Sequence, residues 1–304
     1  MEIVVSTNRH LGDTLILSGA LRNLREAIPE AEIWYRGDYG AVFENTPVHT
    51  DNYPEHPDYT LHVKATDFGQ CERVHEGGNM VERQTRALAQ YLGRDIPCEY
   101  PEPYVVLTAE EMAQAERYPA CGGILINTNC QAGSTVKGYP YWGDVIRYLA
   151  ELPHMRKYPL VLTGGREARD VRGSLGDLPA RVVDIRGRTS IREFLALVYY
   201  SECVVSPPSS IVHAAAAFCG RAVVVSGARE PATLTTYANT RHLATICRGR
   251  RRYMYNSRYG CMHFHAARDG KSCEFPVEVG GRCYARCMAA IPPELIATTI
   301  QEML

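Results

Sequence analysis

Residues 203–225 read CVVSPPSSIVHAAAAFCGRAVVV, and they decide the fold of this chain. An apolar run, a polar turn, a helix of small residues and a second apolar run are typical of a βαβ unit. The turn opens onto a helix N-terminus, where unpaired N–H groups and the helix dipole attract phosphate. Ser209 and Ser210 can cap that helix, and His213 lies one turn inside it. The alternative is an ordinary helix start with a hydrogen-bonded histidine.

The composition is that of a soluble globular protein with two domains. The chain has 304 residues, of which 45% are hydrophobic and 22% charged, and its formal net charge is −1. This charge predicts no general attraction to nucleic acid or anionic membranes. No stretch approaches the ~20 apolar residues of a membrane span, and the first residues lack the basic region of a signal peptide. We therefore expect a cytoplasmic protein whose 11 cysteines do not form a disulfide framework.

The rest of the chain repeats the alternation of strands and helices. The first half predicts strands at 3–6 and 31–35 and helices at 14–28 and 79–92, and Pro119–Gly123 is typical of a hinge. The second half predicts strands at 124–128, 160–163, 182–185, 204–206 and 222–226, with helices near 142–152, 190–200 and 209–219. We expect an α/β protein in which two doubly wound domains, 1–118 and 119–246, face each other across a cleft, followed by a segment at 247–304. Ligands of such sheets bind at the carboxyl ends of the strands.

Five motifs in this order resemble glycosyltransferase family 9, the bacterial heptosyltransferases. They are LGDTL at 11–15, STVKGYPYW at 134–142, LVLTGG at 160–165, GRTSIRE at 187–193, and the turn at 209–216 with GAREP at 227–231. The resemblance spans residues 1–240. It implies a GT-B fold with acceptor contacts in the first domain and a nucleotide-diphosphate sugar, the donor, in the second. One departure is clear: the family has Asp-Ser-Gly where this chain has Pro208-Ser209-Ser210. Contacts of that aspartate cannot be carried over.

Asp13 is the candidate general base for the acceptor hydroxyl. From the residues alone, a cap for the helix predicted at 14–28 is the favoured interpretation. The resemblance favours the base, which would take the proton of the attacking hydroxyl.

The donor site is expected to hold the diphosphate without a divalent cation, since no Asp-x-Asp motif occurs. Lys137 lies in a Gly/Ser/Thr-rich loop after a strand, where a cation would stabilise the departing pyrophosphate; a solvated surface lysine is the alternative. The Thr163-Gly164-Gly165 turn allows close backbone approach, although a plain turn explains it nearly as well. The donor-binding residues that we expect are Gly12, Lys137, Thr163, Gly164, Gly165, Ser209, Ser210, His213 and Gly227.

A cluster of cysteines near the C-terminus predicts a metal site. Cys261, Cys273, Cys283 and Cys287 lie in a loop-rich segment with little apolar content. Such a segment needs a cross-link or a bound metal to hold a fixed structure. Thiolates in a cytoplasmic protein suggest structural zinc or iron, and Cys247, His263 or His265 could replace a ligand. Scattered reduced cysteines are the alternative. The segment also resembles that of the autotransporter heptosyltransferases, a branch of the family with a cysteine-bound iron finger.

Basic and tyrosine residues alternate in the stretch RGRRRYMYNSRY at 248–259. Such a stretch could pair with phosphates and stack on bases, although a solvated charge run is the simpler interpretation.

We therefore expect an inverting glycosyltransferase that moves a sugar, with heptose as the candidate, to a hydroxyl of a protein, lipopolysaccharide or modified DNA. A nucleotide-sugar epimerase and a non-catalytic nucleotide-binding or nucleic-acid-binding module are the alternatives. An oligomer is compatible with the sequence.

Overall fold

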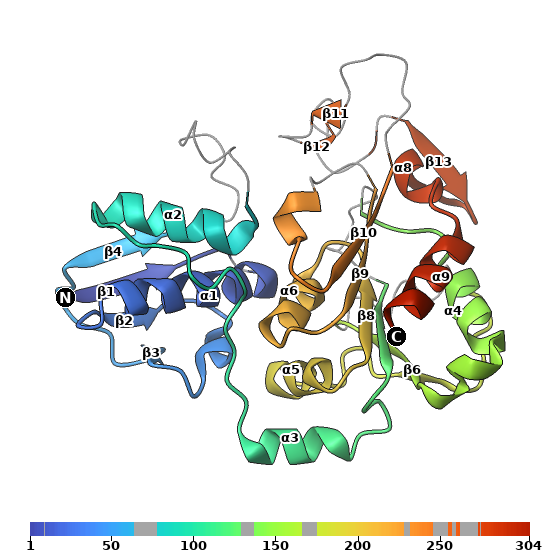
Figure 1. Cartoon of the computed structure of the whole chain (residues 1–304), viewed down its shortest axis with the longest axis horizontal. Helices are drawn as coiled ribbons and strands as arrows, with labels where there is room; N and C mark the ends of the chain where they lie inside the picture. The colour runs from blue at the N-terminus through green and yellow to red at the C-terminus, as the bar shows by residue number, and fades with distance from the viewer. Residues whose placement is uncertain are drawn as a thin grey trace.

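The computed structural model describes residues 1–8, 10–63, 78–128, 137–165, 175–227, 232–245, 255–256, 260–261, 273 and 275–304. Two parallel sheets with helices packed on them account for most of these residues (Figure 1). This is the GT-B arrangement that the sequence predicts.

The first sheet has the strand order β3-β2-β1-β4, and all its strands are parallel. Its elements are β1 (Glu2–Ser6), β2 (Glu32–Tyr35), the 3-10 turn η1 (Gly40–Phe43), β3 (Val48–His49) and β4 (Tyr59–His62), with helices α1 (Leu11–Ala27) and α2 (Met80–Leu92). The order reverses between β1 and β4, so their carboxyl ends form a topological switch point.

Helix α1 begins three residues earlier than the sequence predicts. Its N-cap is His10, whose side chain makes no capping bond to any described residue, and Asp13 lies inside the first turn. The alternative interpretation of Asp13 as the helix cap is therefore wrong. The early start has a physical reason: Leu11 packs against the core and Thr14 and Leu15 are buried, so the apolar face extends to the helix start. A carboxylate in the first turn also complements the helix dipole.

The second sheet has six parallel strands in the order β10-β9-β8-β5-β6-β7. Its strands are β5 (Ile124–Asn127), β6 (Leu160–Thr163), β7 (Val182–Asp184), β8 (Cys203–Ser206), β9 (Ala222–Gly227) and β10 (Thr240–Ala244). The helices are α3 (Ala109–Glu116), α4 (Trp142–Glu151), α5 (Ile191–Tyr199) and α6 (Ser210–Ala217), with 3-10 turns η2 (Pro153–Lys157) and η4 (Ala232–Thr235). This is the strand order of a doubly wound nucleotide-binding domain, with its switch point between β5 and β8.

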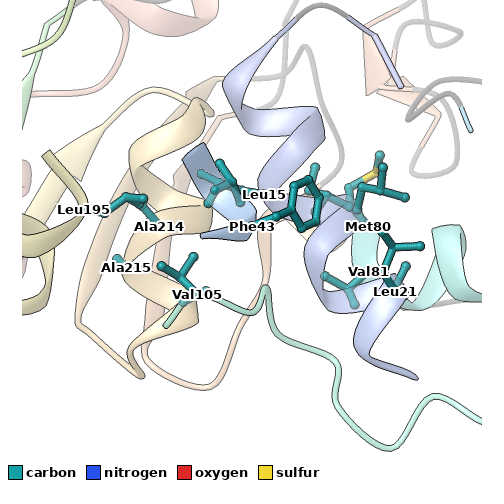
Figure 2. Close-up of a cluster of buried hydrophobic side chains, with 14 of the residues drawn as sticks. Leu15, Leu21, Phe43, Met80, Val81, Val105, Leu195, Ala214 and Ala215 are labelled. Atoms are coloured by element: carbon teal, nitrogen blue, oxygen red, sulfur yellow. The ribbon is translucent and has the colours of Figure 1, made fainter. Parts of the chain in front are cut away.

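One apolar core runs from the first sheet through α1 into the second domain. Figure 2 shows Leu15 and Phe43 of the first domain beside Leu195 and Ala214 of the second, and all four side chains are buried. The contact places the starts of α1 and α6 together. Helix α3 packs on α5, and the predicted domain boundary at 118 stays a prediction.

The C-terminal residues return to the second domain. The hairpins β11 (Tyr255–Asn256) with β12 (Gly260–Cys261) and β13 (Pro276–Val279) with β14 (Arg282–Ala285) precede α8 (Arg286–Ala289) and α9 (Pro293–Met303). Helix α9 packs on α4, and the buried Tyr139 hydroxyl donates to the Ile291 carbonyl at 2.8 Å. The C-terminal residues are therefore part of the core of the second domain.

Gly19 lets α1 lie against α2 and the linker. A Cβ there would overlap the carbonyl oxygen of Glu102 and lie 2.8 Å from Val81 Cγ1. We expect Gly19→Ala to lower the free energy of unfolding by about 1–3 kcal/mol, as overpacked cores do, measured by urea denaturation. At an exposed helix position, Gly→Ala would instead raise the free energy of unfolding by about 1 kcal/mol. A stabilised Gly19→Ala variant would therefore contradict this packing.

Arg192 on α5 ties the two domains together. It pairs with Glu111 on α3, at 2.6 Å from Nε to Oε1, and donates to the carbonyls of Ala41 and Val106. The Arg192 hydrogen bond lowers the pKa of Glu111 to about 2, well below its ordinary value of 4.5. The stability that this ion pair contributes is therefore complete above about pH 4.5 and is lost as the pH falls toward 2.

We expect Glu111→Gln to cost about 2 kcal/mol of unfolding free energy near pH 7, and the deficit to shrink as the medium is acidified. Urea denaturation of the wild type and the variant over this range measures it. The control is Glu110→Gln on the neighbouring exposed carboxylate, which should change little. A deficit that stays constant down to about pH 3 would contradict the assignment.

Candidate functional site

The carboxyl ends of β5 and β8 carry a connected set of polar side chains. Asn127 Nδ2 donates to Ser209 Oγ at 3.2 Å, and Ser206 Oγ lies 2.6 Å from Ser209 Oγ. Beside them, the hydroxyl of Thr128 is buried and has no hydrogen-bond partner within the described part of the chain. Polar side chains thus collect at the switch point of the second sheet, where doubly wound folds bind ligands.

Ser209 does not cap α6 with its side chain, which corrects the sequence-based expectation. It occupies the N-cap position, but its hydroxyl bonds with Ser206 and Asn127 instead. The sheet offers these partners at hydrogen-bonding distance, so the hydroxyl turns toward them. Ser209 therefore leaves the N–H groups of the first turn of α6 without a cap from the N-cap side chain. Such groups form an anion-binding surface.

Lys137 lies next to the same turn. Its ammonium donates to the carbonyl of Pro208 at 3.3 Å. Pro208 stands two residues before α6 begins at Ser210, so this cation lies close to the start of the helix. A positive charge and unpaired N–H groups at one point favour a phosphate group.

His213 lies one turn inside α6 and is 6% exposed. Its Nδ1 is 2.7 Å from the hydroxyl of Tyr237, and the two rings meet edge to face at 87°. The histidine is therefore held by a side chain from the segment before β10.

The start of α1 faces the start of α6. A Cβ on Gly12 would lie 3.5 Å from His213 Cδ2 and 3.6 Å from Ser210 Cα. Asp13 is the next residue, partly buried in the first turn of α1. The structure thus places Gly12 of one domain, the residue before Asp13, against His213 and Ser210 of the other.

The first sheet contributes polar groups at its own switch point. His62 Nδ1 lies 2.9 Å from Ser6 Oγ, joining the ends of β1 and β4. Below the start of α1, the buried hydroxyl of Tyr35 bonds with Thr14 Oγ1 at 3.0 Å. Tyr35 thus supports the turn that carries Asp13.

Gly164 and Gly227, two glycines that the sequence predicts to bind the donor, have different surroundings. Gly164 has φ of +134° at the end of β6, and its carbonyl accepts from Gly187 N at 2.8 Å, while Thr163 is buried. At Gly227, a Cβ would lie 2.7 Å from Met288 Sδ and 3.1 Å from Cys287 Sγ. The chain's own helix α8 therefore fills the space at Gly227.

The cysteine site and the basic stretch lie largely beyond the described residues. This holds for Cys247, His263, His265 and most of 248–259, and for the side chain of Cys261. Cys273 is partly buried, Cys283 is exposed and Cys287 is buried. Among the residues described, no three metal-binding side chains come together, so this part of the chain supplies no assembled metal site.

Two doubly wound domains in which the starts of two helices lie side by side, as those of α1 and α6 do, are typical of nucleotide-binding proteins. The model of glycosyltransferase family 9 (heptosyltransferase) matches residues 70–263. The chain belongs to this family and is a glycosyltransferase. No curated protein sequence matches it significantly.

Solved structures share the fold. The ADP-heptose lipopolysaccharide heptosyltransferase II of E. coli has a TM-score of 0.68 at 15% identity, covering 100% of this chain and 98% of its own. A family 9 glycosyltransferase from Veillonella parvula scores 0.70 at 15% identity, covering 99% and 96%. The iron-containing dodecameric glycosyltransferase TibC of enterotoxigenic E. coli scores 0.65 at 16% identity, covering 99% and 78%.

No helix within the described residues combines the length and the apolar content that crossing a membrane requires.

Proposed function

We propose that this protein transfers a heptosyl group from ADP-heptose to a hydroxyl acceptor, with inversion at the anomeric carbon. The observation that carries the proposal is the contact between the two helix starts, in which Gly12 lies against His213 and Ser210. In this proposal the carboxylate of Asp13, the residue after Gly12, acts beside a surface suited to a diphosphate. The heptosyltransferase relatives of the same fold support the choice of donor.

In the proposed mechanism, the acceptor hydroxyl attacks the anomeric carbon while Asp13 takes its proton. The bond between that carbon and the β-phosphate oxygen breaks, and ADP leaves with the electron pair. Lys137 and the N–H groups at the start of α6 stabilise the charge that grows on the departing diphosphate. A single displacement of this kind inverts the configuration. The turn Pro208-Ser209-Ser210 holds the diphosphate through backbone groups, without the aspartate found in the family.

The remaining donor residues stay proposals. Thr163, Gly164 and Gly165 lie at the carboxyl end of β6, a strand of the second sheet. In our proposal, the backbone of this turn approaches the nucleotide closely. Gly227 is better explained by its packing against Met288 than by a ligand.

The experiment is to incubate the purified protein with ADP-heptose, with and without acceptors, and to follow both ADP and the sugar. We expect acceptor-dependent release of ADP and an inverted glycosidic bond. The acceptors to offer are a serine-rich protein, a lipopolysaccharide core and modified DNA. An altered nucleotide sugar formed from the donor alone would replace this proposal with the epimerase.

A structural zinc or iron ion on Cys261, Cys273, Cys283 and Cys287 is a further proposal, prompted by the sequence and by the iron-containing TibC. No catalytic step depends on it. Elemental analysis should find zinc or iron in the wild type and less in Cys283→Ser. A metal-free wild type with an intact fold would contradict it. The oligomeric state and the expected cytoplasmic location also stay predictions.

A further inference from the structure

A small pocket lies along the second half of α1 in the first domain. Its volume is about 150 Å³, far more than the ~10–15 Å³ that one water molecule needs, so it has room for a group of several atoms. Its walls come from α1, from η1 and β3, and from the segment 93–108 between α2 and α3. The lining residues that decide its chemistry are Leu21, Arg22, Arg25, Phe43, Val48 and Tyr104.

Arg22 is held at this pocket by two aromatic rings. Its guanidinium carbon lies 3.6 Å from the ring centre of Tyr100 and 4.9 Å from that of Tyr104. Stacking uses the flat face of a guanidinium and leaves the N–H groups on its edge for hydrogen bonds. Tyr104 is itself fixed, because its backbone N–H donates to the hydroxyl of the buried Ser18 at 2.9 Å. The cation is therefore preorganised, with little side-chain freedom to lose on binding.

Arg25 adds a second guanidinium on the same side of α1, because residues three apart are neighbours on a helix. One of its N–H groups donates to the carbonyl of Ala31 at 3.1 Å, whereas a guanidinium has five such donors. Among the residues that the structure describes, neither Arg22 nor Arg25 pairs with a carboxylate. This includes the exposed Glu26, which also lines the pocket. The pocket thus carries two positive charges and one exposed negative charge.

Two guanidiniums without an acidic partner favour a phosphate group, which offers several acceptor oxygens and up to two negative charges. Leu21, Phe43 and Val48 provide an apolar wall for the carbon atoms that carry such a group. We propose that this pocket binds a phosphate monoester, with its phosphate group between Arg22 and Arg25.

This phosphate is distinct from the diphosphate of the donor. Arg22 and Asp13 are separated by about 13 Å along α1, at a rise of ~1.5 Å per residue. The site therefore does not rest on the proposed function. Its phosphate has two possible sources, a phosphorylated acceptor and a free metabolite.

Nitrogen NMR of protein labelled on its arginines tests the site, with inorganic phosphate as the probe. The Nε–H signals of Arg22 and Arg25 are assigned from those missing in Arg22→Gln and Arg25→Gln. We expect phosphate to shift both signals along one saturating curve, and each substitution to weaken binding about tenfold or more, the size of a hydrogen bond to a charged group. Phosphate that leaves both signals unmoved would overturn the proposal. These signals report on the pocket alone, so they decide the proposal whether or not the protein transfers a sugar.

Two further variants separate a built site from general attraction to surface charge. Glu26→Gln should tighten phosphate binding about twofold to fivefold, because it removes one screened negative charge. Arg36→Gln is the matched control, since Arg36 also lies over a tyrosine of the first domain, 4.7 Å from the ring centre of Tyr53, but does not line the pocket. It should leave the affinity within about twofold. Equal losses in Arg36→Gln and Arg22→Gln would overturn the proposal, as would acetate that binds the two arginines more tightly than phosphate.

Transfer assays at saturating donor distinguish the two sources. For a phosphorylated acceptor, inorganic phosphate should raise the KM of that acceptor in the wild type but not in Arg22→Gln. For a free metabolite, the KM of the acceptor should stay unchanged while phosphate still shifts the arginine signals. A protein without transfer activity would refute the proposed function and leave the spectra to decide the pocket.

Discussion

Asp13→Asn is expected to lower kcat for sugar transfer by about 10²–10⁴-fold, the usual contribution of a general base. The amide is nearly isosteric with the carboxylate but cannot accept the proton of the acceptor hydroxyl. Asp13 stands in the first turn of α1, beside the start of α6, so the loss falls on the chemical step. The measurement is steady-state kinetics of ADP release with saturating donor and acceptor.

The control for this variant is its affinity for ADP, which should stay within about threefold of the wild type because Lys137 and α6 are untouched. Asp144→Asn on α4 is the matched exposed carboxylate, since it pairs with Arg147 on the outer surface. It should leave kcat unchanged. Full activity of Asp13→Asn would show that another group takes the proton.

Lys137→Ala is expected to lower kcat/KM for the nucleotide sugar by about 10²–10³-fold, the range found when one stabilising donor is removed from a transition state. The ammonium contacts the carbonyl of Pro208, two residues before α6 begins. Charge grows on the diphosphate as the sugar leaves, so kcat should fall more than donor affinity. Rapid-quench measurement of a single turnover separates the two effects.

Lys157→Ala provides the comparison for a surface lysine. Lys157 lies over the ring of Tyr158 on the second domain, and its removal should leave kcat/KM within about twofold. Lys137→Arg keeps the charge but spreads it over a planar fork, so partial activity is expected. A Lys137→Ala variant as active as the wild type would assign the phosphate contact to backbone groups alone.

Much of the fold could be predicted because parallel strands buried on both faces read as continuous apolar runs. The strand predicted at 204–206 and the helix near 209–219 correspond to β8 and α6. The helix predicted at 14–28 missed its first three residues, because Gly12 lies against Ser210 and His213 of the second domain. That contact is tertiary and leaves no periodic signal in the sequence.

The site was only partly predictable for the same reason. Asn127 and Thr128 end an apolar run as Ser206 does, and this shared position could have identified them. Tyr237 could not be found from spacing, since it lies 24 residues after His213 and meets it only in the folded chain. The cap predicted for Ser209 failed because a neighbouring strand offered its hydroxyl other partners.

The central claim is that a carboxylate of one domain and an anion-binding helix start of the other act on the same nucleotide sugar. A crystal structure of the protein with ADP tests it most directly. We predict the β-phosphate within hydrogen-bonding distance of the N–H groups at the start of α6 and of Lys137 Nζ, with Asp13 on the facing side. ADP bound away from α6, or a bound β-phosphate that is screened from Asp13 by protein, would contradict the account.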